Sequence, residues 1–173
     1  TLNRPHQEPH PPLAVAAFGP KGLRQAARRG LPYLASPMES LNQIRENLEI
    51  YSEALPNEFR QDEPIVPIMR TVFVCRNDAT KKQILERLDS ENPHYTRSPS
   101  AKTPKVIARA MEAPIEERVV VGSVAEVTDQ LALYRNSLGM NLMVVRPQIS
   151  GTDESERIES LDRLLEEVWP QLD

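Results

Sequence analysis

Apolar and polar positions alternate along this chain in blocks that predict a repeated strand–helix order. Four short, nearly continuous apolar runs have the pattern of strands buried on both faces, at residues 13–18, 31–35, 66–75 and 142–145. Stretches in which apolar side chains recur at helical spacing follow these runs, most clearly over residues 41–55 and 124–138. This order is typical of an α/β fold with a parallel sheet, in which ligands bind at the carboxyl ends of the strands.

Capping residues predict where several of the helices begin and end. Ser36 is predicted as the N-cap of one helix, with Glu39 three residues later to close a capping box. Ser123 and Glu126 form the same pair before a second helix, and Asp78 is predicted to cap a third. The end signals are glycines just after a helix, at Gly30 and Gly139.

The remaining segments connect the parts of a single domain that we expect to span residues 1–173. Residues 1–12 hold four prolines and no apolar periodicity, which predicts an extended lead-in. Residues 89–104 are polar and rich in proline and serine, and we expect a flexible surface loop there. Residues 105–113 predict a short helix, and residues 118–122 form a short apolar segment.

Composition narrows the class of protein. Of the 173 residues, 39% are apolar and 27% charged, which fits a soluble globular domain with a sizeable core. A net charge of −4 gives no basic surface for nucleic acid, and no apolar run approaches the ~20 residues of a membrane helix. Cys75 is the only cysteine, so an intrachain disulfide is excluded and no metal site is expected. A reducing, cytoplasmic compartment fits this cysteine usage.

The turn after the first predicted strand carries the clearest candidate chemistry. It has the sequence Phe18-Gly19-Pro20-Lys21-Gly22 and opens a helix. The backbone N–H groups of Gly19, Lys21 and Gly22 are expected to point outward at the positive end of the helix dipole. Lys21 adds a positive charge, whereas Pro20 contributes no donor. The turn therefore predicts an anion site, and the alternative is that its glycines only permit a tight turn.

Five segments carry a resemblance to a known family through their order and spacing. They are RPHQEPHPPLAVAAFGPKGLRQAARRGLPYL from Arg4, IYSEAL from Ile50, MRTVFVCRNDA from Met69, VVVGSVAEVTDQLALYRNSLGMNLMVVRP from Val119 and ESLDRLLEEVWPQL from Glu159. Together they are similar to the carboxyl-terminal half of the luciferase-like flavin monooxygenases. The resemblance implies strands five to eight of a TIM barrel, which are about four parallel (β/α) units. This is a half or incomplete barrel, because a whole one needs ~200–250 residues or more.

The resemblance also implies a cofactor, reduced FMN, at the carboxyl end of the barrel. Ala17, Phe18 and Gly19 would line this flavin, and Lys21 and Gly22 would reach its phosphate. Many relatives carry serine or threonine in this turn. Since this chain has neither there, its phosphate contacts would come from backbone N–H groups and the lysine.

Two arginines and three histidines are the other residue types that could contribute to a site. Arg146 follows the last predicted strand at its carboxyl end, where it is predicted to bind substrate, with a surface ion pair as the alternative. Arg70 falls in the middle of a strand, and a salt bridge is favoured over a place in the barrel interior. His6, His10 and His94 lie in polar segments and are predicted to be solvated.

These observations predict a flavin-dependent oxidoreductase, a monooxygenase that uses reduced FMN and oxygen on a small organic substrate. The flavin carries such chemistry itself, so few protein groups need be catalytic. The resemblance implies that the acid–base histidine of the bacterial luciferases belongs to the first half of the barrel, so no catalytic residue is assigned here. Two alternatives stay open. One is a deazaflavin-dependent dehydrogenase, and the other is a non-catalytic half-barrel that assembles through unpaired edge strands, for instance as a homodimer.

Overall fold

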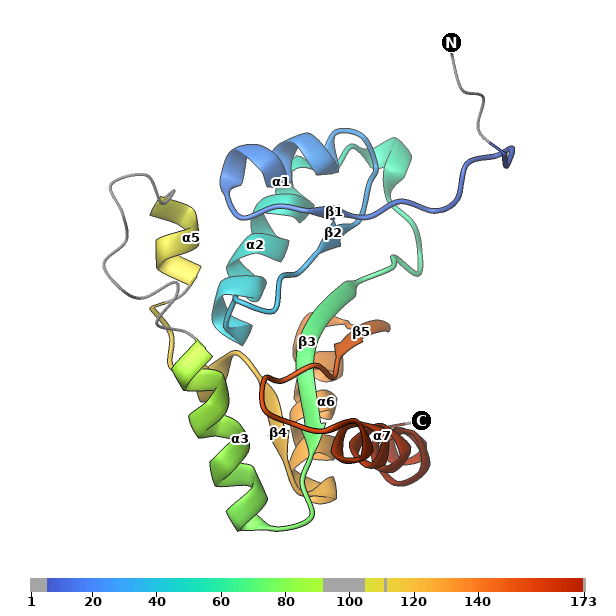
Figure 1. Ribbon diagram of the computed structural model, residues 1–173. Helices are drawn as coiled ribbons and strands as arrows, with labels where there is room; N and C mark the ends of the chain where they lie inside the picture. The colour runs from blue at the N-terminus through green and yellow to red at the C-terminus, as the bar shows by residue number, and fades with distance from the viewer. Residues whose placement is uncertain (1–5, 92–104, 111, 173) are drawn as a thin grey trace.

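The computed structural model describes residues 6–91, 105–110 and 112–172, and strands and helices alternate along it (Figure 1). In chain order the elements are β1 (Val15–Ala16), α1 (Pro20–Ala27), β2 (Tyr33–Leu34), α2 (Leu41–Ala54), β3 (Pro67–Val74), α3 (Asp78–Glu91), α5 (Lys105–Ala110), β4 (Val120–Gly122), α6 (Val124–Leu138), β5 (Leu142–Arg146) and α7 (Glu154–Arg163). Short helical turns join or extend them, namely η1 (Asn57–Phe59), η2 (Ile115–Glu117), the π-helical η3 (Leu164–Val168) and η4 (Trp169–Gln171). Each apolar run that was predicted to be a strand contains one, and a helix follows each of these strands. The predicted order is therefore confirmed.

All strand pairs are parallel, as predicted. β1 pairs with β2, while β3 pairs with β4 along one edge and with β5 along the other. A bridge between Ala35 and Ile68 joins the end of β2 to β3, and the Met69 N–H donates to the Ala35 carbonyl. The Cys75 N–H donates to the Gly122 carbonyl. Because alternate N–H groups of a strand point to one edge, β2 and β4 lie along the same edge of β3. The strands β1, β2, β3 and β5, which we call the four main strands, are therefore neighbours in chain order.

The larger core lies between the sheet and the helices α1, α2, α6 and η3. Its fully covered side chains include Leu23, Ile44, Ile68, Val72, Val127 and Leu131. Burying a side chain of this size contributes roughly 1.5–3 kcal/mol. A parallel sheet needs such helical cover, and this face, which we call the helix face, has it along all four main strands.

A second, smaller core lies on the other side of β3 and β4, beneath α3. Phe73, Cys75 and Val121 point to that side, and α3 covers them with Ile84 and Leu88. Figure 1 shows α3 on one side of β3 and β4, with α6 and α7 on the other. The carboxyl-terminal half of β3 is therefore buried on both faces, which explains its long apolar run.

The side of the sheet opposite the helix face is open over β1 and β5. Strand register places six exposed or half-buried residues on this open face, namely Ala16, Leu34, Met69, Leu142, Val144 and Arg146. The side chain of Leu142 is 48% exposed there. The open face is therefore apolar, with one cation at the carboxyl end of β5.

One helix start differs from its prediction because of tertiary burial. α2 begins after Ser40, which caps it together with Gln43, four residues beyond the predicted cap Ser36. The Ser36 N–H does donate to the Glu39 carboxylate, at 2.8 Å, as a capping box requires. Glu39 is nevertheless buried and also accepts a hydrogen bond from Tyr33, so residues 36–39 fold into a turn before the helix.

α3 differs from its prediction at both ends. Its cap is Asn77, whose side chain accepts from the Thr80 N–H at 2.9 Å, whereas Asp78 is the first helical residue. The helix continues through residue 91, because Leu88 packs against the sheet and holds its last turns in place. The first three residues of the predicted 89–104 loop are therefore helical. Residues 92–104 lie outside the described residues.

Other boundaries follow the sequence. Ser123 and Glu126 form the predicted capping box of α6, and Gly139 ends that helix with φ +69°. Gly30, with φ +65°, donates to the Ala27 carbonyl after α1, the hydrogen bond of a glycine that terminates a helix. α5 occupies residues 105–110 of the predicted short helix, and β4 ends the apolar segment 118–122.

Candidate functional site

The carboxyl ends of the strands lie along one edge of the sheet, since the strands are parallel. β1 leads there into the turn at residues 18–22, β2 leads into the turn at residues 36–39, and β5 ends at Arg146. The open face adjoins this edge. The combination of the edge and the open face is the candidate site.

Gly19 is the N-cap of α1, and it leaves the start of the helix without a side-chain cap. Its backbone is extended, with φ −155° and ψ 164°, a conformation that any residue adopts. Serine, asparagine or aspartate would therefore fit the backbone and cap the helix better. Pro20 has no N–H, so the N–H groups of Lys21 and Gly22 remain as donors at the positive end of α1.

Gly22 allows α1 to approach β1 closely. A Cβ at this position would lie 3.2 Å from the Cβ of Ala17, closer than ordinary van der Waals contact. The Ala17 side chain is buried in the core between strand and helix. It therefore faces α1 and not the open face, which leaves only its backbone for contact with a cofactor.

Phe18 and Pro20 line a cavity of about 70 Å³ that α2 and α5 close on its far side. α5 is anchored to α2 there by two contacts. Gln43 Nε2 donates to the Arg109 carbonyl at 2.7 Å, and the Arg109 guanidinium pairs with Glu46 at 2.7 Å. A cavity of this size holds about two water molecules and is too small for a flavin ring.

Arg146 and Lys21 are the exposed cations predicted for this edge. Arg146 stands on the open face, in register with Thr71 of β3. It forms no ion pair with any residue that the structure describes, so the surface ion pair weighed for it is not found. Lys21 is exposed in the first turn of α1. Both side chains can reach a ligand in the surrounding solvent.

Arg70 lies on the helix face and is fully buried. Its Nη1 donates to the Ser36 carbonyl at 2.6 Å, and its Nη2 donates to the Glu39 carbonyl at 2.8 Å. Its Nε donates to the Tyr134 hydroxyl at 2.9 Å. The predicted salt bridge is wrong, because no carboxylate among the described residues pairs with this guanidinium. Arg70 instead fastens the 36–39 turn to β3 and α6.

The Glu39 carboxylate completes this buried network, which the sequence did not predict. It is 2% exposed and accepts hydrogen bonds of 2.6–2.8 Å from Tyr33, Ser36 and Asn47. Burial raises the pKa of Glu39, although the hydrogen bonds and the nearby Arg70 charge oppose the change. Burial, with the charge of Glu39, also raises the pKa of Tyr33. The only signal in the sequence was the spacing from Ser36 to Glu39, which identified one donor correctly.

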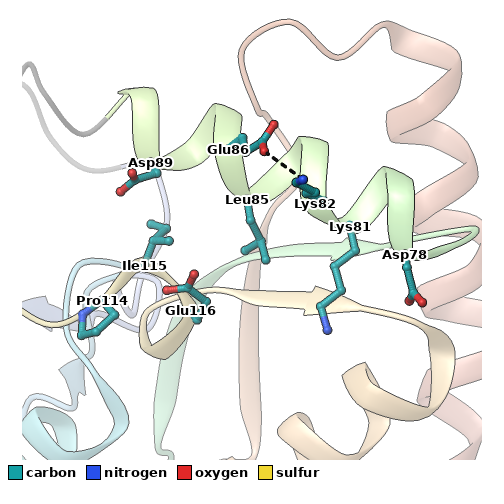
Figure 2. Close-up of a pocket in the computed structure, with 9 residues that line it drawn as sticks. All are labelled: Asp78, Lys81, Lys82, Leu85, Glu86, Asp89, Pro114, Ile115 and Glu116. Atoms are coloured by element: carbon teal, nitrogen blue, oxygen red, sulfur yellow. Dashed lines mark ion pairs between the residues drawn. The ribbon is translucent and has the colours of Figure 1, made fainter.

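A groove of about 590 Å³ runs between α3 and η2 (Figure 2). Figure 2 shows Lys82 and Glu86 paired on α3, at 4.0 Å. Lys81 pairs with Glu126 at 2.6 Å, and this hydrogen bond, with that from the Ser123 N–H, lowers the pKa of Glu126 to about 2. Within the described ranges no three His, Cys, Asp or Glu side chains are placed to hold a metal ion. The groove therefore carries mixed charge, with both of its lysines in ion pairs, and no evident chemistry.

Cys75 and the described histidines add no reactive group to the candidate site. Cys75 is buried, and burial raises the pKa of its thiol to about 11, so the side chain serves packing and not reactivity. His6 and His10 are exposed in the lead-in, as predicted. His94 lies outside the described residues. None of the described helices has both the length and the hydropathy of a transmembrane span.

Comparison with a family model agrees with this architecture. The model described as luciferase-like monooxygenase matches residues 1–141. A comparison with curated proteins gives no match.

Three solved structures share the fold. Monooxygenase RslO1 from Streptomyces bottropensis is 19% identical with a TM-score of 0.70, over 99% of this chain and 51% of its own. Apo-MsnO8 is 23% identical with a TM-score of 0.65, over 96% and 53%. The oxygenating constituent of 3,6-diketocamphane monooxygenase from Pseudomonas putida, a type II Baeyer–Villiger monooxygenase in complex with FMN, is 20% identical with a TM-score of 0.68, over 94% and 49%. The chain thus spans about half the length of these proteins.

Proposed function

The chain belongs to the luciferase-like monooxygenase family, and on that premise we propose that it supplies the phosphate turn and part of the substrate site of an FMN-dependent monooxygenase. Its substrate would be a small organic molecule. The observation that carries the proposal is the uncapped start of α1 at the carboxyl end of β1. A bound flavin supplies the oxygen chemistry, whereas the protein binds it, orients it and excludes water.

The phosphate of FMN fits the donors at the start of α1. The N–H groups of Lys21 and Gly22 are available there, the Lys21 ammonium is exposed, and no acidic residue lies in the first turn. An anion at such a helix start is stabilised by the free N–H groups and by the helix dipole. Glycine at position 19 leaves these donors to a ligand, which explains the absence of a capping side chain.

The open face offers a surface for the flavin ring or for the substrate. Ala16, Leu34, Met69 and Val144 present apolar atoms on neighbouring strands. Arg146 stands at the carboxyl end of this surface without an ion-pair partner in the described part of the chain. Its guanidinium would bind a polar or anionic group of the substrate or flavin.

We further propose that the chain provides strands five to eight of a barrel. Two observations support this. The alignment covers about half of each similar structure, and β1 and β5 each pair along one edge only within the described residues. The unpaired edges would accept four further (β/α) units. If a second copy of this chain supplied them, sedimentation would report a dimer.

A titration that compares FMN with riboflavin tests the phosphate turn. The fluorescence of FMN should be quenched when it binds to the chain. Riboflavin, which lacks the phosphate, should bind more weakly. In Gly19→Asp the new carboxylate caps α1 and repels the phosphate. We expect the affinity of Gly19→Asp for FMN to fall about tenfold or more, to the level of its affinity for riboflavin. The affinity for riboflavin itself should not change. Equal affinity of the unmodified chain for both flavins would contradict the assignment.

The same titration with a deazaflavin addresses the alternative cofactor. A deazaflavin that binds more tightly than FMN would favour a dehydrogenase on this scaffold over a monooxygenase. If the chain binds none of these ligands at millimolar concentration, this chain alone does not form the flavin site.

A further inference from the structure

A second cavity, of about 570 Å³, opens at the amino ends of the strands, opposite the candidate site. The lead-in at Leu13, the loop before β2 at Leu31 and the connection before β3 at Val66 contribute walls. The end of α6 at Leu138 contributes another. Figure 1 shows the lead-in and the connection from α2 to β3 on the same side of the molecule. We call this cavity the amino-end pocket.

The charge of the amino-end pocket differs from that of the rest of the molecule. None of its seventeen lining residues is Asp or Glu, although the chain has 25 acidic residues and a net charge of −4. Arg60 is the one charged residue that lines it. The adjoining groove along α2 carries Glu49 and Glu53. The pocket therefore combines apolar walls with a single positive charge, which favours an anionic group on an apolar body.

Arg60 is held in position with part of its guanidinium free. Its Nη2 donates to the Ser52 carbonyl at 3.0 Å. Its Nε and Nη1 have no partner among the residues that the structure describes. The neighbouring acids Asp62 and Glu63 are exposed and do not line the pocket. Nη2 carries two hydrogens and the Ser52 carbonyl takes one, so the other lies parallel to an N–H of Nε or of Nη1. Such a pair of parallel N–H groups matches the two oxygens of a carboxylate.

The apolar walls are shaped by specific packing. Gly30 has φ +65°, and a Cβ there would lie 2.7 Å from the ring of Phe59. The absence of that Cβ lets the ring rest against the backbone and close one side of the pocket. Tyr51 lines it as well and brings a hydroxyl. Leu48 and Leu55, also on the lining, are half-buried.

We propose that the amino-end pocket binds a small aliphatic or aromatic carboxylic acid, with its apolar body among the leucines and its carboxylate on Arg60. The volume lies within the range of about 300–1,000 Å³ typical of small-molecule sites. Because the pocket lies at the end of the sheet opposite the flavin turn, this ligand is separate from the proposed FMN and its substrate.

Methyl and amide NMR titrations with octanoate, octanol and octylamine test the proposal on the full chain. The NMR signals of Leu48, Leu55 and Val66 should shift on addition of octanoate and reach a plateau. The other two ligands should bind more weakly. Arg60→Gln should weaken octanoate about tenfold or more and leave octanol unchanged. Arg45→Gln, which removes an exposed arginine of α2 outside the pocket, is the control and should change neither.

Three results would overturn the proposal. Octanol could bind as tightly as octanoate, Arg45→Gln could weaken octanoate as much as Arg60→Gln does, or octanoate could fail to saturate. Leu55→Trp, which fills the pocket, should abolish both octanoate and octanol binding. Its folding is checked by circular dichroism and by unchanged FMN titration. If the unmodified chain binds octanoate but not FMN, the result contradicts the proposed function and leaves the proposal for the amino-end pocket standing.

Discussion

Arg70 and Arg146 stand on adjacent strands of one sheet, one residue apart in register, and their surroundings are opposite. Arg70 is paired with Val145 and points to the helix face, where it is fully buried and donates to three carbonyls and a hydroxyl. Arg146 is paired with Thr71 and points to the open face, where it is exposed. Because side chains of a strand alternate between faces, a shift of one residue separates a structural cation from one available to a ligand.

The largest expected effect comes from removing the buried member of this pair. Arg70→Met would leave the Ser36 and Glu39 carbonyls and the Tyr134 hydroxyl without their donor, and the Glu39 carboxylate without a nearby cation. We expect the free energy of unfolding to fall by about 3–5 kcal/mol. Urea denaturation measures it. Arg70→Lys keeps the charge but not the geometry of the guanidinium, so its stability should lie between those of wild type and Arg70→Met. A loss below 1 kcal/mol for Arg70→Met would contradict the contrast between Arg70 and Arg146.

A smaller effect concerns pH and the carboxylate beside Arg70. The pKa of Glu39 is raised by burial, so the native state holds its proton at pH values where the unfolded chain has released it. The contribution of Glu39 to wild-type stability should therefore fall as pH rises from about 4.3, the ordinary value of glutamate, through the raised pKa of the folded state. Glu39→Gln lacks this titration, and its stability relative to wild type should rise over the same window.

Unfolding curves at pH 4 and pH 7 measure this difference. Glu49→Gln, which removes an exposed carboxylate of α2, serves as the control and should keep the wild-type pH dependence. If the difference in the free energy of unfolding between Glu39→Gln and wild type is the same at pH 4 and pH 7, Glu39 does not titrate as its burial requires.

The smallest effect is expected for the exposed arginine. Arg146→Met should change the free energy of unfolding by less than about 0.5 kcal/mol, because no packing or ion pair of the described residues depends on it. Denaturation under the conditions used for Arg70→Met gives the direct comparison. A loss above 1 kcal/mol would show that Arg146 serves stability, and its proposed role toward a ligand would lose its basis.

Local patterns predicted the strands, their parallel pairing and most helix boundaries. The continuous apolar run of β3 and the capping box at Ser123 are short-range signals with one interpretation. Ser36 and Ser40 each have a suitable partner three residues later, so local chemistry did not distinguish them. The burial of Glu39 decided between them, and burial depends on Tyr33 and Arg70, which belong to other elements.

The candidate site was predictable where it depends on one turn and not where distant segments combine. Gly19 to Gly22 form a helix start that the sequence indicates directly. Two partners of Arg70 are backbone carbonyls more than thirty positions earlier and a third is the hydroxyl of Tyr134 on α6, which no spacing rule identifies. The amino-end pocket likewise draws on segments from residue 12 to residue 138. Such features follow from tertiary packing and become visible only in the folded chain.

The burial of Cys75 beneath α3 makes the single thiol a natural reporter of local opening. With its pKa near 11, the thiol reacts slowly with alkylating reagents while α3 covers it. Labelling must therefore wait until α3 lifts from β3 and β4, so its rate measures how often that helix detaches. Comparison of that rate with the rate of global unfolding would show whether α3 moves as an independent unit of the fold.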